Sequence, residues 1–346
     1  MDASANTNAR TSCAPDAGTR AAALPKPSET EANADARTDT APARSPLPLL
    51  LEVRYLVEYG LLRMVVGLVR LLPLDRAVRI SAAIWKRLAP FGRRHRRALA
   101  NLARAYPEKT PAERQSIAVA MWENLGRVMA ETMLIDRILA EPSRIEVVPD
   151  QVYARYRNKF GSVVGVSLHM GNWELAVWPL TLAGTNPAAV YRFVKNPYVD
   201  RYLRYQRRKL YPGGMLGKGS LMGSNAAAQK TARLMINYVR NGGRLGLVGD
   251  LYDRFGIPVP FFGHLAPSTP APALVARHVG ARIWLSRCIR VGTGSHFKVE
   301  IKELKVPRSN NTADDIKAIT AAMQQQFEAW IREYPEQWMW SNRKWS

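Results

Sequence analysis

The chain from about residue 160 onward alternates short apolar runs with longer segments of helical periodicity. Continuous apolar runs, and one stretch of strict apolar–polar alternation, predict strands at 162–168, 187–193, 244–249, 281–289 and 296–304. Helix-start signals, helix-stop signals or helical spacing predict helices from about 172 and at 197–210, 225–243 and 312–334. This alternation predicts an α/β fold with a mixed central sheet flanked by helices.

The N-terminal part of this fold is expected to begin with a membrane-associated helix at 47–74. The segment is strongly apolar, but no stretch of 18 residues within it is free of charge. A helix that lies in the bilayer interface therefore fits it better than a clean span. Arg54 and Glu58 are spaced to form an ion pair on this helix. A spanning helix and an ordinary core helix are the alternatives.

A basic cluster at 86–109 follows, and its position next to the apolar helix favours contact with anionic headgroups over a merely solvated face. Thr110 and Glu113 form a predicted capping box, which starts a helix that runs to about 134. Residues 1–46 lack an apolar segment and are rich in Ala, Thr, Pro, Asp and Arg, which predicts a disordered tail. One further domain is expected over 75–346.

The charge of the chain is strongly unbalanced. It has 50 Lys and Arg against 28 Asp and Glu, a formal net charge of +22. Such a surface attracts nucleic acid, anionic lipid headgroups or an acidic protein. A basic nucleic-acid-binding protein is thus one hypothesis, but the basic residues are spread along the whole chain and follow no recognised nucleic-acid motif. The two cysteines define no disulfide framework, which fits a reducing compartment.

The stretch SLHMGNWEL (167–175) carries the candidate chemistry. His169 follows a predicted buried strand, and Glu174 lies five residues later in the first turn of the next predicted helix. A bend at Gly171 would bring the two side chains together, with the carboxylate on Nδ1–H and Nε2 free to take a proton from an alcohol. The substrate's own hydroxyl would then be the nucleophile. The alternative is a buried histidine beside a glutamate that only favours the helix N-terminus.

Other common site chemistries are disfavoured by the sequence. GVSLH (165–169) lacks the closing glycine of a nucleophile elbow, and GMLGKGS (214–220) lacks the spacing of a phosphate loop. The five histidines show no metal-ligand spacing. We therefore expect neither a metal nor a cofactor.

Several blocks occur in order across residues 50–346 and resemble one known family. They are RRHRRALANLARAYPE (93–108), HMGNWE (169–174), VYRFVKNPYVDRYL (190–203), GLVGD (246–250), VPFFG (259–263) and YPEQWMW (334–340). The set resembles the lysophospholipid acyltransferase superfamily, which carries His-x4-Asp/Glu, and looks most like the late acyltransferases of lipid A biosynthesis (lauroyl/myristoyl transferases). The chain departs from the pattern at Asn342-Arg343-Lys344, where related proteins often read His-Arg-Arg.

The resemblance implies that 75–346 is an acyltransferase domain. It would move a fatty acyl group from an acyl thioester, usually acyl carrier protein, to a hydroxyl of a lipid A precursor in lipopolysaccharide biosynthesis. His169 would be the general base and Glu174 its partner. Arg192, Asn196 and Asp250 would bind substrate, with Arg192 as an electrophilic or phosphate-binding residue. Asp250 is equally suited to be a structural partner of Arg192.

The same resemblance implies a location at the cytoplasmic face of an inner membrane, with acyl carrier protein and a lipid as partners and no nucleic acid. A glycerol lysolipid and an aminolipid are the alternative acceptors. A non-catalytic membrane scaffold is a further alternative, which intact His169 and Glu174 disfavour. Phe261 and Phe262 would line an acyl channel or, as buried aromatics more often do, belong to the core.

Overall fold

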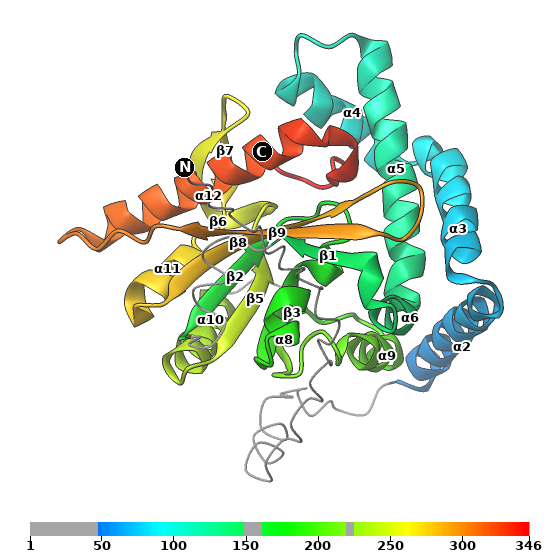
Figure 1. Ribbon diagram of the computed structural model, residues 1–346, viewed down its shortest axis with the longest axis horizontal. Helices are drawn as coiled ribbons and strands as arrows, with labels where there is room; N and C mark the ends of the chain where they lie inside the picture. Colours follow the sequence, from blue (N-terminus) through cyan, green and yellow to red (C-terminus); the bar gives the residue numbers. More distant parts are fainter. Residues whose placement is uncertain (1–47, 149–160, 219–224, 346) are drawn as a thin grey trace, which may run out of the picture.

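The computed structural model describes residues 48–148, 161–218 and 225–345, and it shows an α/β fold around one large sheet (Figure 1). The strand order in this part of the chain is β1 (Ile145–Val148), β9 (Phe297–Leu304), β8 (Arg282–Arg290), β2 (Val163–Ser167), β5 (Arg244–Val248), β3 (Pro187–Arg192) and β4 (Met215–Lys218). The strands from β8 to β4 run parallel, whereas β9 is antiparallel to β8 and parallel to β1. The predicted mixed sheet flanked by helices is confirmed.

The central strand β2 is buried on both faces, which explains its unbroken apolar sequence. Val163 packs in one hydrophobic cluster, while Val164 and Val166 pack in another, and all three are 0% exposed. Successive side chains of a strand point to opposite faces, so a strand covered by helices on both sides favours apolar residues at successive positions.

Two groups of helices cover the sheet. One group comprises α10 (Asn225–Arg240), α11 (Ala271–Val279) and α12 (Thr312–Glu333), and α12 also packs on the hairpin of β6 (Tyr252–Phe261) and β7 (His264–Ser268). The other group comprises α3 (Leu74–Leu88), α5 (Pro111–Met133) and α6 (Ile135–Leu139), whose apolar side chains share a cluster with Val163 and Trp284 of the sheet. Next to them, η1 (Ala89–Phe91) packs on α3 and α5, and α4 (Arg93–Ala105) packs on α5 and η1. Shorter elements complete the described chain: η2 (Pro142–Arg144), η3 (Trp173–Val177), α8 (Trp178–Leu182), α9 (Pro197–Arg207) and η4 (Pro335–Gln337).

Local signals in the sequence set several helix starts. Thr110 Oγ1 accepts a hydrogen bond from the backbone N–H of Glu113 (3.3 Å), and Glu113 Oε2 accepts one from the N–H of Thr110 (2.7 Å), so the predicted capping box is confirmed. Asn196 caps α9 with its side-chain oxygen, which accepts hydrogen bonds from the backbone N–H groups of Tyr198 and Val199. The helix expected from about 172 instead begins as the 3₁₀ turn η3 and becomes α-helical only at Trp178.

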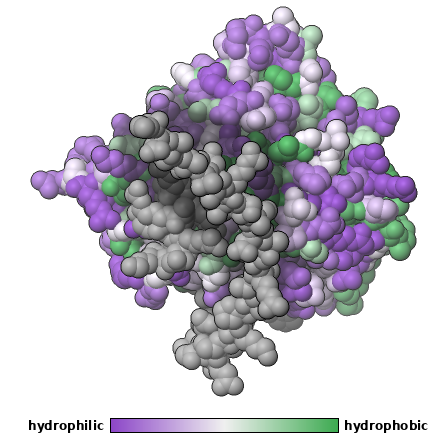
Figure 2. Space-filling view, in the orientation of Figure 1, coloured by the Kyte–Doolittle hydropathy of each residue, from purple (hydrophilic) through white to green (hydrophobic). Residues whose placement is uncertain are grey.

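The first described helix, α2 (Leu49–Leu71), has an apolar face that the other described residues leave uncovered. Its predicted ion pair is present, with Arg54 Nε 2.8 Å from Glu58 Oε1. Of its side chains only Val66 is buried. The large exposed apolar side chains are Leu49, Leu50, Val53, Leu56, Val57, Leu61, Met64, Val65, Leu68 and Leu71. Green atoms at the right margin of Figure 2, where α2 lies in Figure 1, show part of this face.

The described helices include none that is both long enough and apolar enough to cross a membrane. The predicted tail at 1–46 lies outside the described residues.

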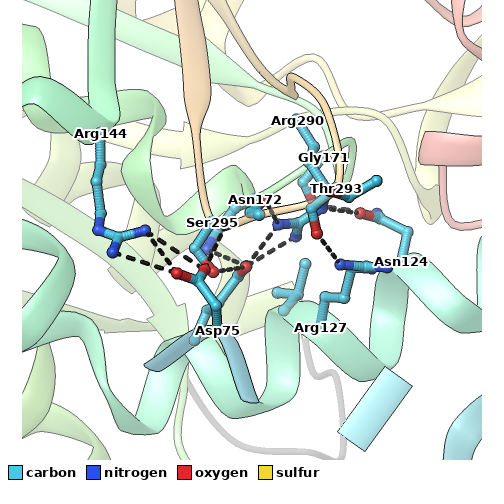
Figure 3. A network of polar contacts seen from close by, with 12 residues as sticks. Asp75, Asn124, Arg127, Arg144, Gly171, Asn172, Arg290, Thr293 and Ser295 are labelled. Carbon is cyan, nitrogen blue, oxygen red and sulfur yellow. Dashed lines mark hydrogen bonds and ion pairs between the residues drawn. The ribbon is translucent and has the colours of Figure 1, made fainter. Parts of the chain in front are cut away.

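A polar network beside the turn that follows β2 includes Asn124, Asn172, Arg290 and Ser295 (Figure 3). A buried carboxylate on α5, that of Glu131, accepts hydrogen bonds from three of them. Glu131 is 0% exposed and accepts hydrogen bonds from Arg290 Nη1 (2.6 Å) and Nη2 (2.8 Å), and from Ser295 Oγ (2.8 Å). Asn172 Nδ2 donates to the same carboxylate at 3.0 Å. Because burying an unpaired carboxylate costs several kcal/mol, these four donors make the burial of Glu131 tolerable.

The network extends to neighbouring segments on both sides. Asn124 Nδ2 donates to the carbonyl oxygen of Gly171 (3.2 Å), and Arg127 Nη1 donates to that of Thr293 (2.6 Å). On α3, Asp75 accepts from the N–H of Ser295 (3.0 Å). The network therefore ties α3 and α5 to the β8–β9 turn and to the HMGNWE stretch.

We expect Arg290→Met to lower the free energy of unfolding by about 3–5 kcal/mol, because it leaves the Glu131 carboxylate buried without its ion-pair partner. The double variant Arg290→Met/Glu131→Leu should recover part of this loss, since it removes the stranded charge as well. Denaturant unfolding followed by tryptophan fluorescence measures both. As a control, Arg54→Met breaks an exposed ion pair and should change stability by less than about 1 kcal/mol. A double variant no more stable than Arg290→Met would contradict the role given to Glu131.

Candidate active site

Two neighbouring strands deliver the candidate site to one edge of the sheet. β2 and β5 pair in parallel with Ser167 opposite Val248, so both strands end at the same level. His169 follows the end of β2 by two residues, and Asp250 follows the end of β5 by two residues. The carboxyl ends of parallel strands are where α/β proteins commonly place ligand-binding and reacting groups.

His169 and Asp250 form a hydrogen-bonded pair. Nδ1 of His169 lies 2.8 Å from Asp250 Oδ1, and the backbone N–H of His169 donates to Oδ2 at 2.9 Å. The indole N–H of Trp338 donates to Oδ2 at 2.7 Å. The His169 side chain is 19% exposed and the Asp250 side chain is 0% exposed. The imidazole is thus partly exposed, while the Asp250 carboxylate is buried. The ring of Trp173 lies beside the imidazole at a centroid distance of 5.2 Å.

The surroundings of Asp250 keep it ionised. Burial by itself raises the pKa of the carboxyl, but the attraction of His169 and the hydrogen bonds from His169 and Trp338 outweigh it and hold the pKa below its usual range. A carboxylate on Nδ1–H fixes the tautomer of the imidazole, so that Nε2 carries the lone pair. The pair therefore has the arrangement of a general base with an orienting carboxylate.

The predicted contact between Glu174 and His169 is wrong. Glu174 Oε2 accepts from Arg207 Nε at 2.8 Å, and Arg207 Nη2 donates to Oε1, so the two side chains form a bidentate ion pair between η3 and α9. Both are mostly buried. Although burial lowers the pKa of Arg207, the charge of Glu174 more than offsets it and raises the pKa. Glu174 cannot serve Nδ1 of His169 because Asp250, from the neighbouring strand, already occupies that position.

The bend predicted at Gly171 is present and has a steric cause. Gly171 has φ +56°, and a Cβ at this position would collide with the carbonyl oxygen of Cys288 on β8. Only glycine fits this close approach without strain. The bend sends Glu174 towards α9 rather than back towards His169, which is why spacing alone predicted the wrong partner.

The C-terminal segment forms a wall of the site, a role that sequence reasoning missed. The N–H of Met339 donates to the carbonyl oxygen of His169 (3.0 Å), and the N–H of Gly171 donates to that of Gln337 (3.0 Å). Trp338, between them in sequence, reaches Asp250. The YPEQWMW block, noted only for its resemblance, thus holds the histidine turn in place.

The predicted substrate-binding residues Arg192 and Asp250 have different surroundings in the structure. Arg192 ends β3, is exposed, and lies at the same edge of the sheet as His169. The expectation that Asp250 pairs with Arg192 is wrong. The Asp250 oxygens accept hydrogen bonds from His169 and Trp338 instead.

Asn196 has a structural role, and its predicted substrate contact stays a prediction. Its side chain is 3% exposed, and its Oδ1 accepts from the backbone N–H groups of Tyr198 and Val199. Its Nδ2 donates to the carbonyl oxygen of Tyr55 (2.8 Å) and to Glu58 Oε2 (3.1 Å). The amide therefore caps α9 and attaches this helix to α2.

Phe261 and Phe262 belong to the core, as the more common of their two interpretations predicts. They are 0% and 4% exposed and pack with Tyr106, Trp338 and Trp340. The described residues contain no group of three or more His, Cys, Asp or Glu side chains that could hold a metal ion.

Comparison with known proteins identifies the family. The model of the bacterial lipid A biosynthesis acyltransferase family matches residues 48–346. The chain is 24% identical over 252 residues to a phosphatidylinositol mannoside acyltransferase of Mycobacterium tuberculosis (strain CDC 1551 / Oshkosh), covering 71% of this chain and 75% of that protein. It is 25% identical over 183 residues to the protein of that name from Mycolicibacterium smegmatis, covering 51% and 54% of the two chains. The match over nearly the whole described chain shows that this protein belongs to the bacterial lipid A biosynthesis acyltransferase family and is an acyltransferase.

Proposed function

We propose that the protein transfers a fatty acyl group from a thioester to a hydroxyl group of a glycolipid, with His169 as the general base. The observation that supports this most is the buried Asp250 carboxylate on Nδ1 of a partly exposed histidine. Nε2 takes the proton of the acceptor hydroxyl as its oxygen attacks the thioester carbonyl. The thiolate leaves and takes that proton, so the products are an ester and a thiol. No enzyme nucleophile is needed.

Asp250 and Glu174 have separate parts in this proposal. Asp250 orients the imidazole and stabilises the imidazolium that forms during the reaction. Glu174 acts at a distance, because its ion pair with Arg207 holds η3, which follows the histidine turn directly. Arg192, exposed at the same edge, is the proposed contact for an anionic group of either substrate.

The proposed acceptor is a lipid A precursor, which the name of the matching family model supports. A phosphatidylinositol mannoside is the second candidate, since the curated relatives are named for it. Both are anionic glycolipids. The proposed donor is acyl carrier protein, which is acidic and is suited to a chain with a net charge of +22. Exposed basic side chains are concentrated on α3 and α4, at Arg76, Arg79, Lys86, Arg87, Arg93, Arg94, Arg96 and Arg97.

The same surface supports a proposal for location, the cytoplasmic face of an inner membrane. The uncovered face of α2 continues over α3 and η1 with exposed Ile80, Ile84, Leu88 and Phe91. An apolar face bordered by arginine and lysine matches a helix that lies in the interface of an anionic bilayer. In this arrangement the lipid acceptor would reach the site from the membrane.

In an assay with purified protein, an acyl donor and lipid acceptors analysed by mass spectrometry, His169→Ala should lower turnover by at least about a hundredfold. Asp250→Asn should lower it by about 10²–10⁴-fold, because the amide can present the wrong tautomer of the imidazole. Acyl carrier protein and coenzyme A thioesters, supplied in parallel, test the donor. The two candidate glycolipids test the acceptor.

His264→Ala is the matched control for this assay, because it removes an exposed histidine on β7 and should leave turnover unchanged. A folded His169→Ala protein with near-normal turnover would show that the histidine is not the base. Transfer to neither glycolipid would reject the proposed acceptor class.

Glu174→Gln and Arg207→Gln should each reduce turnover by at least about tenfold, because either change breaks the ion pair that positions η3. The double variant should lose little more than the worse single variant, since both changes remove the same interaction. Glu303→Gln, at a longer and partly exposed ion pair with Arg282 (3.7 Å), is the control. Losses that multiply in the double variant would mean that Glu174 and Arg207 act independently.

Leu61→Glu/Leu68→Glu should reduce binding to anionic liposomes by at least tenfold in a flotation assay. Burying a leucine side chain is favourable by about 1.5–3 kcal/mol, and the two carboxylates also repel anionic headgroups. Both leucines are more than half exposed, so the fold should tolerate the change. Leu265→Glu, at an exposed leucine on the β6–β7 hairpin, should bind liposomes as the unmodified protein does. Unaltered binding of the double variant would show that α2 is not the membrane-facing helix.

A further inference from the structure

Behind the His169–Asp250 pair lies a buried lysine that the reaction as described does not use. Lys344 is 0% exposed. Its Nζ donates to Gln324 Oε1 on α12 (2.7 Å) and to Ser268 Oγ at the end of β7 (3.0 Å), and it lies 4.4 Å from the ring centroid of Phe261. Both hydrogen-bond partners are neutral. A lysine with no access to water is uncommon unless it is paired with an opposite charge.

Short paths of contacts connect this lysine to Asp250. Gln324, which accepts from Lys344, donates its Nε2 to the carbonyl oxygen of Gly249 (2.8 Å), the residue directly before Asp250. On another side, Phe261 contacts both Lys344 and the indole of Trp338, whose N–H binds Asp250. The ammonium group and the carboxylate therefore belong to one buried polar cluster.

The balance of charge in this cluster makes the lysine titratable near neutrality. Burial lowers the pKa of Lys344 to about 7, and the negative charge of Asp250 raises it only in part. Asp250 in turn accepts hydrogen bonds from His169 and Trp338, which favour its ionised form. Asp250 and Lys344 thus share one low-dielectric region, where the charge of each affects the other, and the His169 ring is hydrogen-bonded to Asp250.

The elements packed around Lys344 present it with few other charges. β6 contributes Phe261, β7 contributes Ser268 and α12 contributes Gln324, all uncharged. Further along α12, Glu328 accepts from the backbone N–H of Phe262 and pairs with Arg332. The adjacent Arg343 lies over the ring of Tyr252 at 4.1 Å.

We propose that Lys344 is a positioning residue for the proposed acyl transfer, whose buried ammonium group acts on the Asp250–His169 pair and opposes protonation of the imidazole. The inference deepens the proposed function and rests on it. A positive charge near the pair keeps Asp250 ionised and disfavours a second positive charge on His169. The base is thereby kept neutral, in the form that accepts a proton from the acceptor hydroxyl.

Lys344→Met, which removes the charge and keeps similar length, tests this directly. Without the ammonium group, protonation of the imidazole becomes easier, so the titration midpoint of His169 should move to higher pH. We expect a shift on the order of one pH unit, which is a tenfold change in the protonation equilibrium of the imidazole. The acidic limb of the kcat/KM profile should move in the same direction by the same amount. NMR of histidine-labelled full-length protein measures the midpoint, with the His169 signal assigned by its loss in His169→Gln.

Two further variants separate charge from packing. Lys344→Arg changes the packing but keeps a positive charge, because a guanidinium group stays protonated, so the His169 midpoint should stay near its value in the unmodified protein. Lys344→Gln removes the charge but keeps a donor for Gln324, so it should shift the midpoint as Lys344→Met does. It replaces Lys344→Met in the test if the methionine variant does not fold. A purely structural role would lower melting temperature and kcat while the midpoint stayed in place.

An unmoved midpoint in folded Lys344→Gln overturns the proposal, whatever the activity of the variant. The NMR midpoint does not depend on turnover. The effect of Lys344 on His169 and the role of His169 as general base are therefore judged separately. A shifted midpoint in a protein whose acyl transfer survives His169→Ala would support the coupling and reject His169 as the base.

Discussion

The active-site edge of this fold depends on the burial of one carboxylate. Asp250 is 0% exposed, and a carboxylate in that position is stable only if donors from the protein replace water. Two of its hydrogen bonds come from His169 and a third comes from Trp338. One buried charge therefore forces three segments together: the end of β5, the turn after β2 and the C-terminal segment. The general base that we propose is a consequence of that requirement.

A second buried carboxylate holds the same turn from its other side. Glu131 on α5 binds Asn172 and Arg290, while Asp250 binds His169, so residues on either side of Gly171 are anchored to different layers of the protein. Gly171 itself presses against β8, where no larger residue fits. The imidazole is in this way held in place before any substrate binds. Preorganisation of this kind is what a general base requires, because a small misplacement reduces the rate steeply.

The apolar helix and the active-site turn are linked through α9. Asn196 caps α9 and donates to Tyr55 and Glu58 on α2. At the other end of α9, Arg207 holds Glu174, which follows the histidine by five residues. The surface that we propose for the membrane and the base that we propose for the chemistry are therefore connected through one short helix, α9. In this arrangement Glu174, the last residue of the His-x4-Glu motif, helps to hold the turn in place.

The sequence by itself determined the features that depend on neighbours along the chain. These include the burial of β2, the capping box at Thr110, the Arg54–Glu58 pair and the bend at Gly171. The partners of His169 and Glu174 were decided by the tertiary structure alone. Asp250 lies 81 residues from His169 along the chain, and the two meet because β5 pairs with β2. Strand order, and the return of the C-terminal segment that brings in Trp338 and Lys344, result from packing between distant elements. Local spacing carries no signal of such contacts, so it suggested Glu174, the carboxylate nearer in sequence, as the partner of His169.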